Sequence, residues 1–199
     1  MSSLDFYFDF SSSYSYVAHT EVEALAKRQG WEVNWIPISL GVIFQSHGHA
    51  IPTQGTAKQR YLWRDVERSA AAQGMPYQWP KPFPFNSIPL ARGFLWLQRQ
   101  DPAAAKRFAH TLFQQLYAEG GNTGDPAALL QRACESISVV AADMTEAIQG
   151  DDIKGALKTT TAEAMARGVF GAPTFAVGDE LFWGADRLLQ LEQHLKKAG

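Results

Sequence analysis

The chain has 199 residues, of which 46% are hydrophobic and 19% are charged, and its formal net charge is −2. A chain of this size can bury a substantial core as one large domain or two small ones. The near-neutral charge disfavours a nucleic-acid-binding protein, which would need a basic surface. The one cysteine, Cys134, excludes an internal disulfide, and we interpret it as a buried, inert thiol in a helix.

The sequence also limits the location of the protein. Its first residues lack the basic and apolar regions of a signal peptide, and no apolar run approaches the roughly 18 residues that span a bilayer. We therefore expect a soluble, cytoplasmic protein. His47, His49, His110 and His194 do not have the spacing of metal ligands, so we expect no metal site.

The first forty residues predict a strand, a helix and a second strand. Residues 4–10 are aromatic and partly alternating, residues 14–29 have apolar positions at helical spacing, and residues 31–38 alternate again. A strand, a helix and a strand in this order predict two parallel strands joined by a crossover helix.

The middle of the chain is predicted to be mainly helical. Residues 41–56 resemble a loop, and the proline-dense residues 76–89 cannot form regular helix or a central strand. Asp101 and Asp125, each followed by proline, are candidate N-caps. The predicted helices cover residues 58–74, 90–100, 102–119, 125–136, 144–149 and 151–167.

The end of the chain predicts a hairpin and a last helix. Residues 174–177 and 180–183 have strand patterns around a Gly178-Asp179 turn, and residues 186–197 are amphipathic. The two ends of the chain can share one sheet, which predicts an α/β, thioredoxin-like fold with an inserted all-helical domain. Residues 1–40 and 168–199 would form the discontinuous thioredoxin-like domain, and residues 41–167 the connecting loop and helical insertion.

In such a fold, the N-terminus of the first helix can stabilise a thiolate. Redox members carry C-x-x-C at this position, whereas this chain has Ser12-Ser13-Tyr14-Ser15, which cannot exchange disulfides. We interpret the turn as a site where a serine hydroxyl donates to a thiolate that arrives on a ligand. The alternative is that these serines only cap the helix.

Two further motifs lie near the C-terminus. Ala172-Pro173 precedes the hairpin at the position where thioredoxin-like folds have a cis-proline, whose preceding residue pairs through its backbone with a thiol-containing peptide. Asp186 follows the last strand, where a carboxylate and helical N–H groups suit the end of an amino acid. The alternative is that Asp186 caps its own helix.

Four segments together resemble a known family: FYFDF followed by SSYSY, AKQRYLWRD, VFGAPTF and LFWGADRL. They are similar to 2-hydroxychromene-2-carboxylate isomerases, which are close kin of kappa-class glutathione transferases within the DsbA-type folds. The similarity runs in order from Phe6 to about Leu191.

The resemblance implies a glutathione site. Ser12 matches the catalytic serine that holds the glutathione sulfur as thiolate. The residues that match other glutathione contacts are Lys58 near the glycyl carboxylate, Ala172 and Pro173 beside the cysteinyl part, Ala185 and Asp186 at the γ-glutamyl end, and His49 where relatives often carry Asn. Ser13 replaces the proline that usually follows the serine, and without the resemblance Lys58 would be interpreted as a solvated surface lysine.

The same resemblance suggests candidates for the second substrate: Arg60, Tyr61, Arg64 and Asn86. Arg64 and Asp65 can instead be a structural ion pair.

The implied activity is a glutathione-dependent isomerase that interconverts 2-hydroxychromene-2-carboxylate and trans-o-hydroxybenzylidenepyruvate, a reaction of aromatic hydrocarbon catabolism such as naphthalene degradation. The partners would be an aromatic keto acid and glutathione, and a homodimer is a family expectation. Two alternatives stay open: a kappa-like glutathione transferase or peroxidase, and a non-catalytic thioredoxin-like binding protein.

Overall fold

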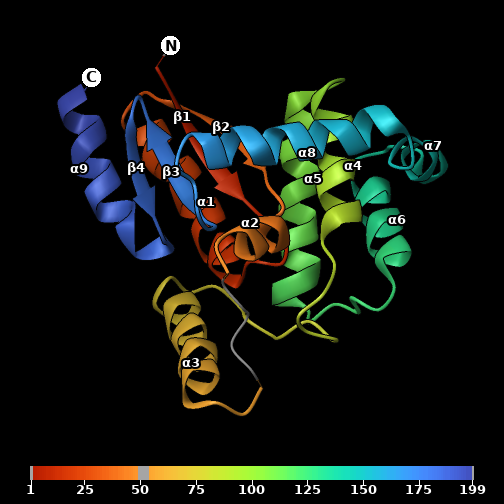
Figure 1. Cartoon of the computed structure of the whole chain (residues 1–199), viewed down its shortest axis with the longest axis horizontal. Helices are drawn as coiled ribbons and strands as arrows, with labels where there is room; N and C mark the ends of the chain where they lie inside the picture. The colour runs from red at the N-terminus through yellow and green to blue at the C-terminus, as the bar shows by residue number, and fades with distance from the viewer. Residues whose placement is uncertain (1, 49–53, 199) are drawn as a thin grey trace.

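A four-stranded sheet with the order β2-β1-β3-β4 joins the two ends of the sequence (Figure 1). β1 (Ser3–Phe8) pairs in parallel with β2 (Glu32–Pro37). β1 also pairs antiparallel with β3 (Thr174–Val177), which continues through a hairpin into the antiparallel β4 (Glu180–Trp183). The predicted strand–helix–strand unit and the C-terminal hairpin therefore share one sheet.

The structure is a computed structural model that describes residues 2–48 and 54–198. Its helices are, in chain order, α1 (Ser13–Arg28), α2 (Leu40–Ser46), α3 (Ala57–Ala72), α4 (Ile88–Gln98), α5 (Pro102–Phe113), the π-helical turn η1 (Gln114–Ala118), α6 (Pro126–Ser136), α7 (Ala141–Ala147), α8 (Asp151–Ala166), the 3-10 turn η2 (Ala185–Arg187) and α9 (Leu188–Ala198).

The alternation of side chains along β1 divides the core between the two faces of the sheet. Phe6 and Phe8 are buried with residues of α1, α4 and α5, and the Phe6 ring stacks on Phe175 with their centroids 5.4 Å apart. Tyr7 points to the opposite face and packs in a second cluster with Ile43 and Ala164, from α2 and α8. The sheet is therefore covered on both faces.

The helices between the two halves of the sheet take different places around it. Figure 1 shows α4 to α7 beside the sheet, α8 running across it, and α3 standing apart below. Asp101 and Asp125 cap α5 and α6 as predicted, since their carboxylates accept hydrogen bonds from Ala104 N and Ala128 N. The division into a sheet domain and a helical insertion stays a prediction.

Two sequence predictions about the middle of the chain need correction. The predicted loop over residues 41–56 is wrong in part, because α2 occupies Leu40–Ser46. Gly41 is a poor helix former and favoured the loop prediction. The helix is nevertheless present, and its Ile43 is buried in the second core cluster. The proline-dense segment is irregular up to Ser87, but α4 begins at Ile88 and tolerates Pro89 in its first turn. Among the described residues, none of the helices has the length and apolar character needed to cross a membrane.

Candidate functional site

Ser12 is the N-cap residue of α1 and lies at the end of the sheet. Its Oγ accepts a hydrogen bond from Ser15 N at 3.1 Å and donates one to the carbonyl of Ala172 at 2.9 Å. Ser12 therefore caps α1, but capping uses only an acceptor site of the hydroxyl and leaves open whether it is the sole role of the residue. The proton of Ser12 remains available to any acceptor that takes the place of the Ala172 carbonyl.

Ser12 and Ser15 occupy the two positions that hold sulfur in a C-x-x-C motif, and the structure separates them. Ser12 lines a cavity, whereas Ser15 is fully buried and its Oγ has no hydrogen-bond partner within the described residues. A ligand can therefore reach the Ser12 hydroxyl but not that of Ser15.

The loop that faces Ser12 contains the cis peptide bond between Ala172 and Pro173. Gly171 in this loop lies under the indole ring of Trp183, and a Cβ at position 171 would come within 2.4 Å of the indole nitrogen. The loop is also tied to the end of β4, because Gly184 N donates to the Pro173 carbonyl at 2.9 Å. The backbone of Ala172 is therefore fixed at the rim of the Ser12 site.

A cavity of about 880 Å³ opens in front of these groups. Its polar lining residues include Ser12 and Asn86, while Phe44 and Phe170 are among its apolar residues. Aromatic side chains form most of the rest, and we call four of them the aromatic wall: Trp63, Trp79, Phe83 and Phe85. The rings of Trp63 and Trp79 stack with centroids 4.4 Å apart. A flat, apolar molecule fits such a surface.

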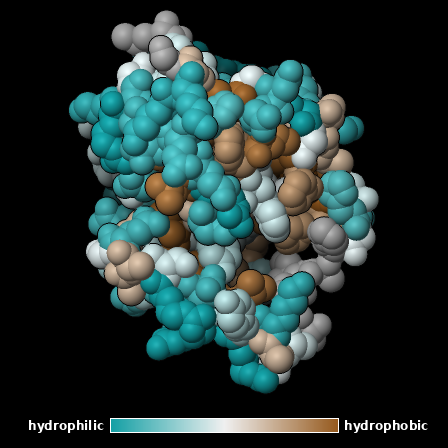
Figure 2. Space-filling view, turned by 90° about the vertical axis from the view of Figure 1, so that its left-hand side faces the viewer, coloured by the Kyte–Doolittle hydropathy of each residue, from teal (hydrophilic) through white to brown (hydrophobic). Residues whose placement is uncertain are grey.

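Hydrophobic side chains are also exposed near the opening. Figure 2 shows the side of the molecule that carries α9 and β4, where hydrophobic residues gather in the middle of a largely hydrophilic surface. Phe170 is 40% exposed and Trp183 is 52% exposed, and their ring centroids are 4.8 Å apart. Both line the cavity.

The charge in the cavity is limited to a few groups. Among its described lining residues, Lys58 is the one cationic side chain, and it lies in the first turn of α3. The Tyr14 hydroxyl donates to Asp65 at 2.7 Å. Burial, this hydrogen bond and the charges of Asp65 and Asp186 raise the pKa of Tyr14, so the phenol stays protonated. Two carboxylates thus lie near Tyr14, and one cation lies in the cavity.

Ala185 and Asp186 form the short turn η2 between β4 and α9. Ala185 is buried, and the exposed carboxylate of Asp186 pairs with Arg187 at 3.1 Å. Within the described residues, the side chain of Asp186 forms no hydrogen bond that caps α9, so the capping alternative is not observed. The carboxylate remains accessible to a ligand cation.

The structure separates the candidates for the second substrate. Asn86 and Lys58 line the cavity. Arg60 donates instead to the carbonyl of Gly55, and the 62%-exposed Tyr61 lies under Arg68. Neither of the two lines the cavity.

Two other sequence interpretations concern Arg64 and His49. Arg64 does not line the cavity, and the suggested pair of Arg64 with Asp65 is wrong: Arg64 pairs with Glu67 at 2.9 Å, and Asp65 with Arg68 at 3.6 Å. His49 lies outside the described residues.

Sequence reasoning missed Asp9 and the aromatic wall. Asp9 follows β1 directly, and its buried carboxylate lines the cavity beside Ser12. The signal for the wall was the dense aromatic and proline pattern from Trp79 to Phe85, which predicted irregular structure but not the direction of the rings.

Cys134 is buried as predicted, and burial raises the pKa of its thiol to about 11. No group of potential metal ligands occurs among the described residues.

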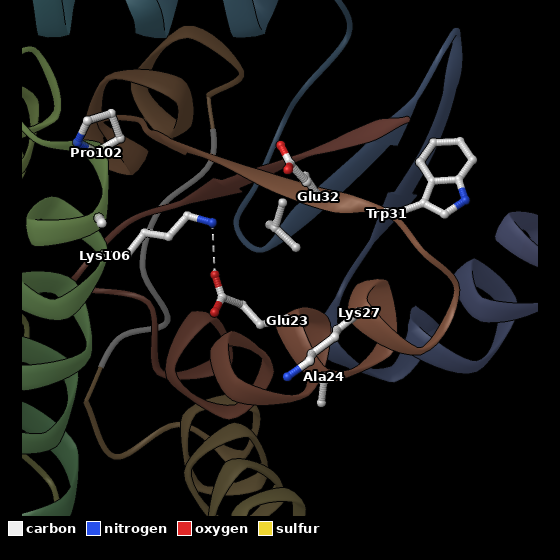
Figure 3. Close-up of a pocket in the computed structure, with 9 residues that line it drawn as sticks. Glu23, Ala24, Lys27, Trp31, Glu32, Pro102 and Lys106 are labelled. Atoms are coloured by element: carbon white, nitrogen blue, oxygen red, sulfur yellow. Dashed lines mark ion pairs between the residues drawn. The ribbon is translucent and has the colours of Figure 1, made fainter. Parts of the chain in front are cut away.

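A second cavity of about 500 Å³ lies between α1, β2 and α5 (Figure 3). Glu23 and Lys106 point toward one another across it, with Glu23 Oε1 and Lys106 Nζ 3.1 Å apart. Trp35 Nε1 donates to the same oxygen at 2.8 Å. Burial of Glu23 raises its pKa, but His110, Lys106 and Trp35 outweigh that effect and lower the pKa to about 2. None of the predicted site residues that the structure describes lines this cavity.

Comparison with known proteins supports the resemblance. Residues 3–196 match the family model described as the DSBA-like thioredoxin domain. The 2-hydroxychromene-2-carboxylate isomerase of Sphingobium xenophagum is 32% identical over 195 residues, which cover 96% of this chain and 97% of that protein. A glutathione S-transferase kappa 2 of Caenorhabditis elegans is 26% identical over 211 residues and covers 96% and 90%.

A solved structure of 2-hydroxychromene-2-carboxylate isomerase superposes with a TM-score of 0.86, at 28% identity and with 98% of this chain and 95% of that chain covered. The predicted thioredoxin-like fold is thereby confirmed. The chain belongs to the family of DSBA-like thioredoxin domains, together with its relatives named 2-hydroxychromene-2-carboxylate isomerase and kappa-class glutathione transferase.

Proposed function

We propose that the protein is a glutathione-dependent isomerase that interconverts 2-hydroxychromene-2-carboxylate and trans-o-hydroxybenzylidenepyruvate. The observation that carries the proposal is the position of the Ser12 hydroxyl, between the N-terminus of α1 and the Ala172 carbonyl, in the lining of a cavity rich in aromatic side chains. The relatives named 2-hydroxychromene-2-carboxylate isomerase support the choice of reaction.

Residues that line the cavity, together with the turn η2 that follows the cavity-lining Trp183 and does not itself line the cavity, fit glutathione. The tripeptide needs a donor for its thiolate, backbone groups for its cysteinyl part, a carboxylate for its ammonium and a cation for a carboxylate. The donor to the thiolate would be Ser12, and the backbone groups would be those of Ala172, which precedes Pro173. The carboxylate would be that of Asp186, which follows Ala185, and the cation would be Lys58. When bound, glutathione supplies a thiolate that adds reversibly to the conjugated double bond of the ring-opened substrate, so that the bond can rotate before it is restored.

The protein contributes to this reaction through Ser12 and the first turn of α1. The free N–H groups of a helix N-terminus favour a negative charge. Ser12 transfers its proton donation from the Ala172 carbonyl to the sulfur, which stabilises the thiolate without any attack by the serine itself. The Ala172 carbonyl is then released to accept a hydrogen bond from the backbone of the peptide.

The aromatic wall and Asn86 orient the acceptor. Stacked rings hold a planar conjugated molecule, and Asn86 is a polar residue that lines the same cavity. Orientation of the double bond against the sulfur is an entropic contribution to the rate. Lys58 supplies positive charge for an anionic ligand, and Asp9 is the other charged side chain among the described lining residues.

A kappa-like glutathione transferase or peroxidase is the second candidate, because the relative from Caenorhabditis elegans carries the name of a kappa transferase and matches this chain over 96% of its length. The groups assigned to glutathione would be the same in both activities. The two activities would differ in the acceptor. They would also differ in the fate of the sulfur, which an isomerase releases from the acceptor and a transferase leaves attached to it.

The test is to assay the purified protein with 2-hydroxychromene-2-carboxylate in three solutions: without thiol, with glutathione, and with S-methylglutathione. We expect equilibration only with glutathione, at an amount far below that of the substrate, because the thiol is regenerated. No glutathione-dependent equilibration would contradict the isomerase. Glutathione binding in calorimetry without isomerisation would favour the transferase, and no binding would favour a non-catalytic protein.

A further inference from the structure

Asp9 carries a buried carboxylate that the proposed mechanism does not use. The residue is 2% exposed and follows the last residue of β1. Its Oδ1 accepts hydrogen bonds from Ser11 N at 2.7 Å, Ser11 Oγ at 2.9 Å and Ser87 Oγ at 2.6 Å, and its Oδ2 accepts one from Leu40 N at 2.7 Å. No ion pair to Asp9 occurs within the described residues, so dipoles alone compensate its charge.

The donors to Asp9 belong to three segments that are far apart in the sequence. Ser11 lies in the turn before α1, Leu40 is the first residue of α2, and Ser87 is the N-cap of α4. Each of these residues lines the large cavity. One carboxylate therefore joins the wall that carries Ser12 to the wall that carries Asn86.

Asp9 also holds Ser12 through its main chain. Ser12 N donates to the Asp9 carbonyl at 2.9 Å, while the side chain of Asp9 holds the preceding residue, Ser11. The backbone that enters α1 is thus fixed on both sides of the Ser11–Ser12 peptide bond. A displacement of this turn would move the Ser12 hydroxyl away from the position that faces Ala172.

The charge of Asp9 and its hydrogen bonds have opposite expected effects on a bound thiolate. The charge destabilises the thiolate, whereas the hydrogen bonds hold the residues that stabilise it. A negative charge near the cavity opposes the formation of a thiolate there. However, a carboxylate only accepts hydrogen bonds, so it suits four converging donors. An asparagine would direct an NH₂ group at some of the same N–H and O–H groups and would leave buried donors without a partner.

We propose that Asp9 is a positioning residue that fixes the Ser12 hydroxyl relative to the segment that carries Asn86 and Ser87. This inference rests on the proposed glutathione site but not on the identity of the acceptor. The same proposal gives Ser87 a positioning role. Through its hydrogen bond to the Asp9 carboxylate, Ser87 sets the position of Asn86 and of the start of α4.

The test is the thiol pKa of glutathione bound to the wild type and to Asp9→Asn, measured by the ultraviolet absorbance of the thiolate as a function of pH. If Asp9 positions Ser12, the substitution raises the thiol pKa, although it removes a negative charge. If Asp9 acts through its charge alone, or is only structural, the thiol pKa falls or stays the same, and the proposal is overturned. The measurement requires no acceptor, so a wrong choice of substrate does not affect it.

Ser87→Ala keeps the carboxylate and removes one of its donors, and it keeps the proposal testable if Asp9→Asn does not fold. We expect an unchanged thiol pKa and a severalfold loss of kcat/KM for any electrophile that the wild type turns over with glutathione, because only the segment that carries Asn86 moves. A kcat/KM equal to that of the wild type contradicts the proposal. Asp101→Asn is the matched control, since Asp101 caps α5 outside the cavity and Asn retains capping ability. If the wild type does not bind glutathione in calorimetry, the proposed function fails before Asp9 is tested.

Discussion

The two halves of α1 both carry polar side chains, but the structure satisfies them differently. At the N-terminal end, the Ser12 hydroxyl and Lys58 of the neighbouring α3 face a cavity of about 880 Å³, and Lys58 has no ion-pair partner within the described residues. In the C-terminal half, Glu23 also borders a cavity, but Lys106 and Trp35 contact its carboxylate.

This difference separates a binding site from a structural network. A charge that protein groups already compensate lowers the free energy of the folded state and has little left to offer a ligand. A donor that faces a cavity, or that has only an exchangeable backbone partner, can transfer its interaction to a ligand. Substitutions of groups that face the large cavity should therefore change binding and rate, whereas substitutions of groups that contact only other protein groups should change stability.

The largest effect is expected for Ser12→Ala, which removes the proposed donor to sulfur. We expect a loss of about 100-fold or more in kcat for glutathione-dependent turnover, as for other donors to a developing anion. The lost N-cap should also cost about 1 kcal/mol of stability, which leaves the protein folded. Steady-state kinetics and a thermal melt would separate the two effects.

Ser13→Ala is the control for this substitution, because it removes a hydroxyl from the next residue of the same turn. It should cost at most a few-fold in rate. Equal losses in the two variants would show that the turn as a whole, and not the Ser12 hydroxyl, is required.

The next effect concerns His19, a buried residue of α1 whose Nδ1 donates to the Tyr16 carbonyl. Burial lowers the pKa of His19 to about 4, so the folded state holds a neutral ring while the unfolded chain gains a proton below about pH 6.5. Stability should therefore fall by about 3 kcal/mol as the pH decreases from about 6.5 to about 4. Urea unfolding across this range would measure it.

His19→Phe should flatten this part of the pH profile, because phenylalanine does not titrate and fits among the aromatic neighbours Phe113 and Trp35. Parallel profiles for the variant and the wild type would exclude His19 as the source of the acid sensitivity. Activity at neutral pH should be unchanged, since His19 does not line the large cavity.

Asp186→Asn should weaken glutathione binding by about 10-fold, the loss that about 1.4 kcal/mol represents. The physical reason is that the exposed carboxylate is proposed to bind an ammonium group, and its present pair with Arg187 is too exposed to contribute much stability. Calorimetry would give the dissociation constant. Asp179→Asn, in the exposed hairpin turn, is the control, and an equal loss in that variant would point to a general charge effect.

The smallest effect is expected for Glu23→Gln, which should cost about 1 kcal/mol of stability with no change in glutathione binding. The cost is small because the side chain is 33% exposed and solvent screens its pair with Lys106. Glu21→Gln on the same helix is the matched control: its pair with Arg28 is more exposed, so the expected change is below about 0.5 kcal/mol. A loss of glutathione binding in Glu23→Gln would break the distinction between the two halves of α1.

The sequence was sufficient for the elements with strong local signals. The period of two in the strands, the N-caps Asp101 and Asp125 and the Gly178-Asp179 turn each depend on a few neighbouring residues, and the structure has these elements within a few positions of the prediction. Helix α2 was missed because its stability comes from contacts with residues far away in the chain: Ile43 packs with α8, and Leu40 N donates to Asp9.

For the candidate site, the sequence by itself determined the residue types: a serine in place of the first sulfur, a proline before the hairpin and an acidic residue before the last helix. Tertiary structure alone decided which of them meet. It joined Ser12 to Ala172 across 160 residues, placed Arg60 and Arg64 away from the cavity and gathered the aromatic wall and Asp9 around it. The physical reason is that local patterns fix the conformation of the backbone, whereas burial and hydrogen-bond partners depend on segments that only the complete fold brings together.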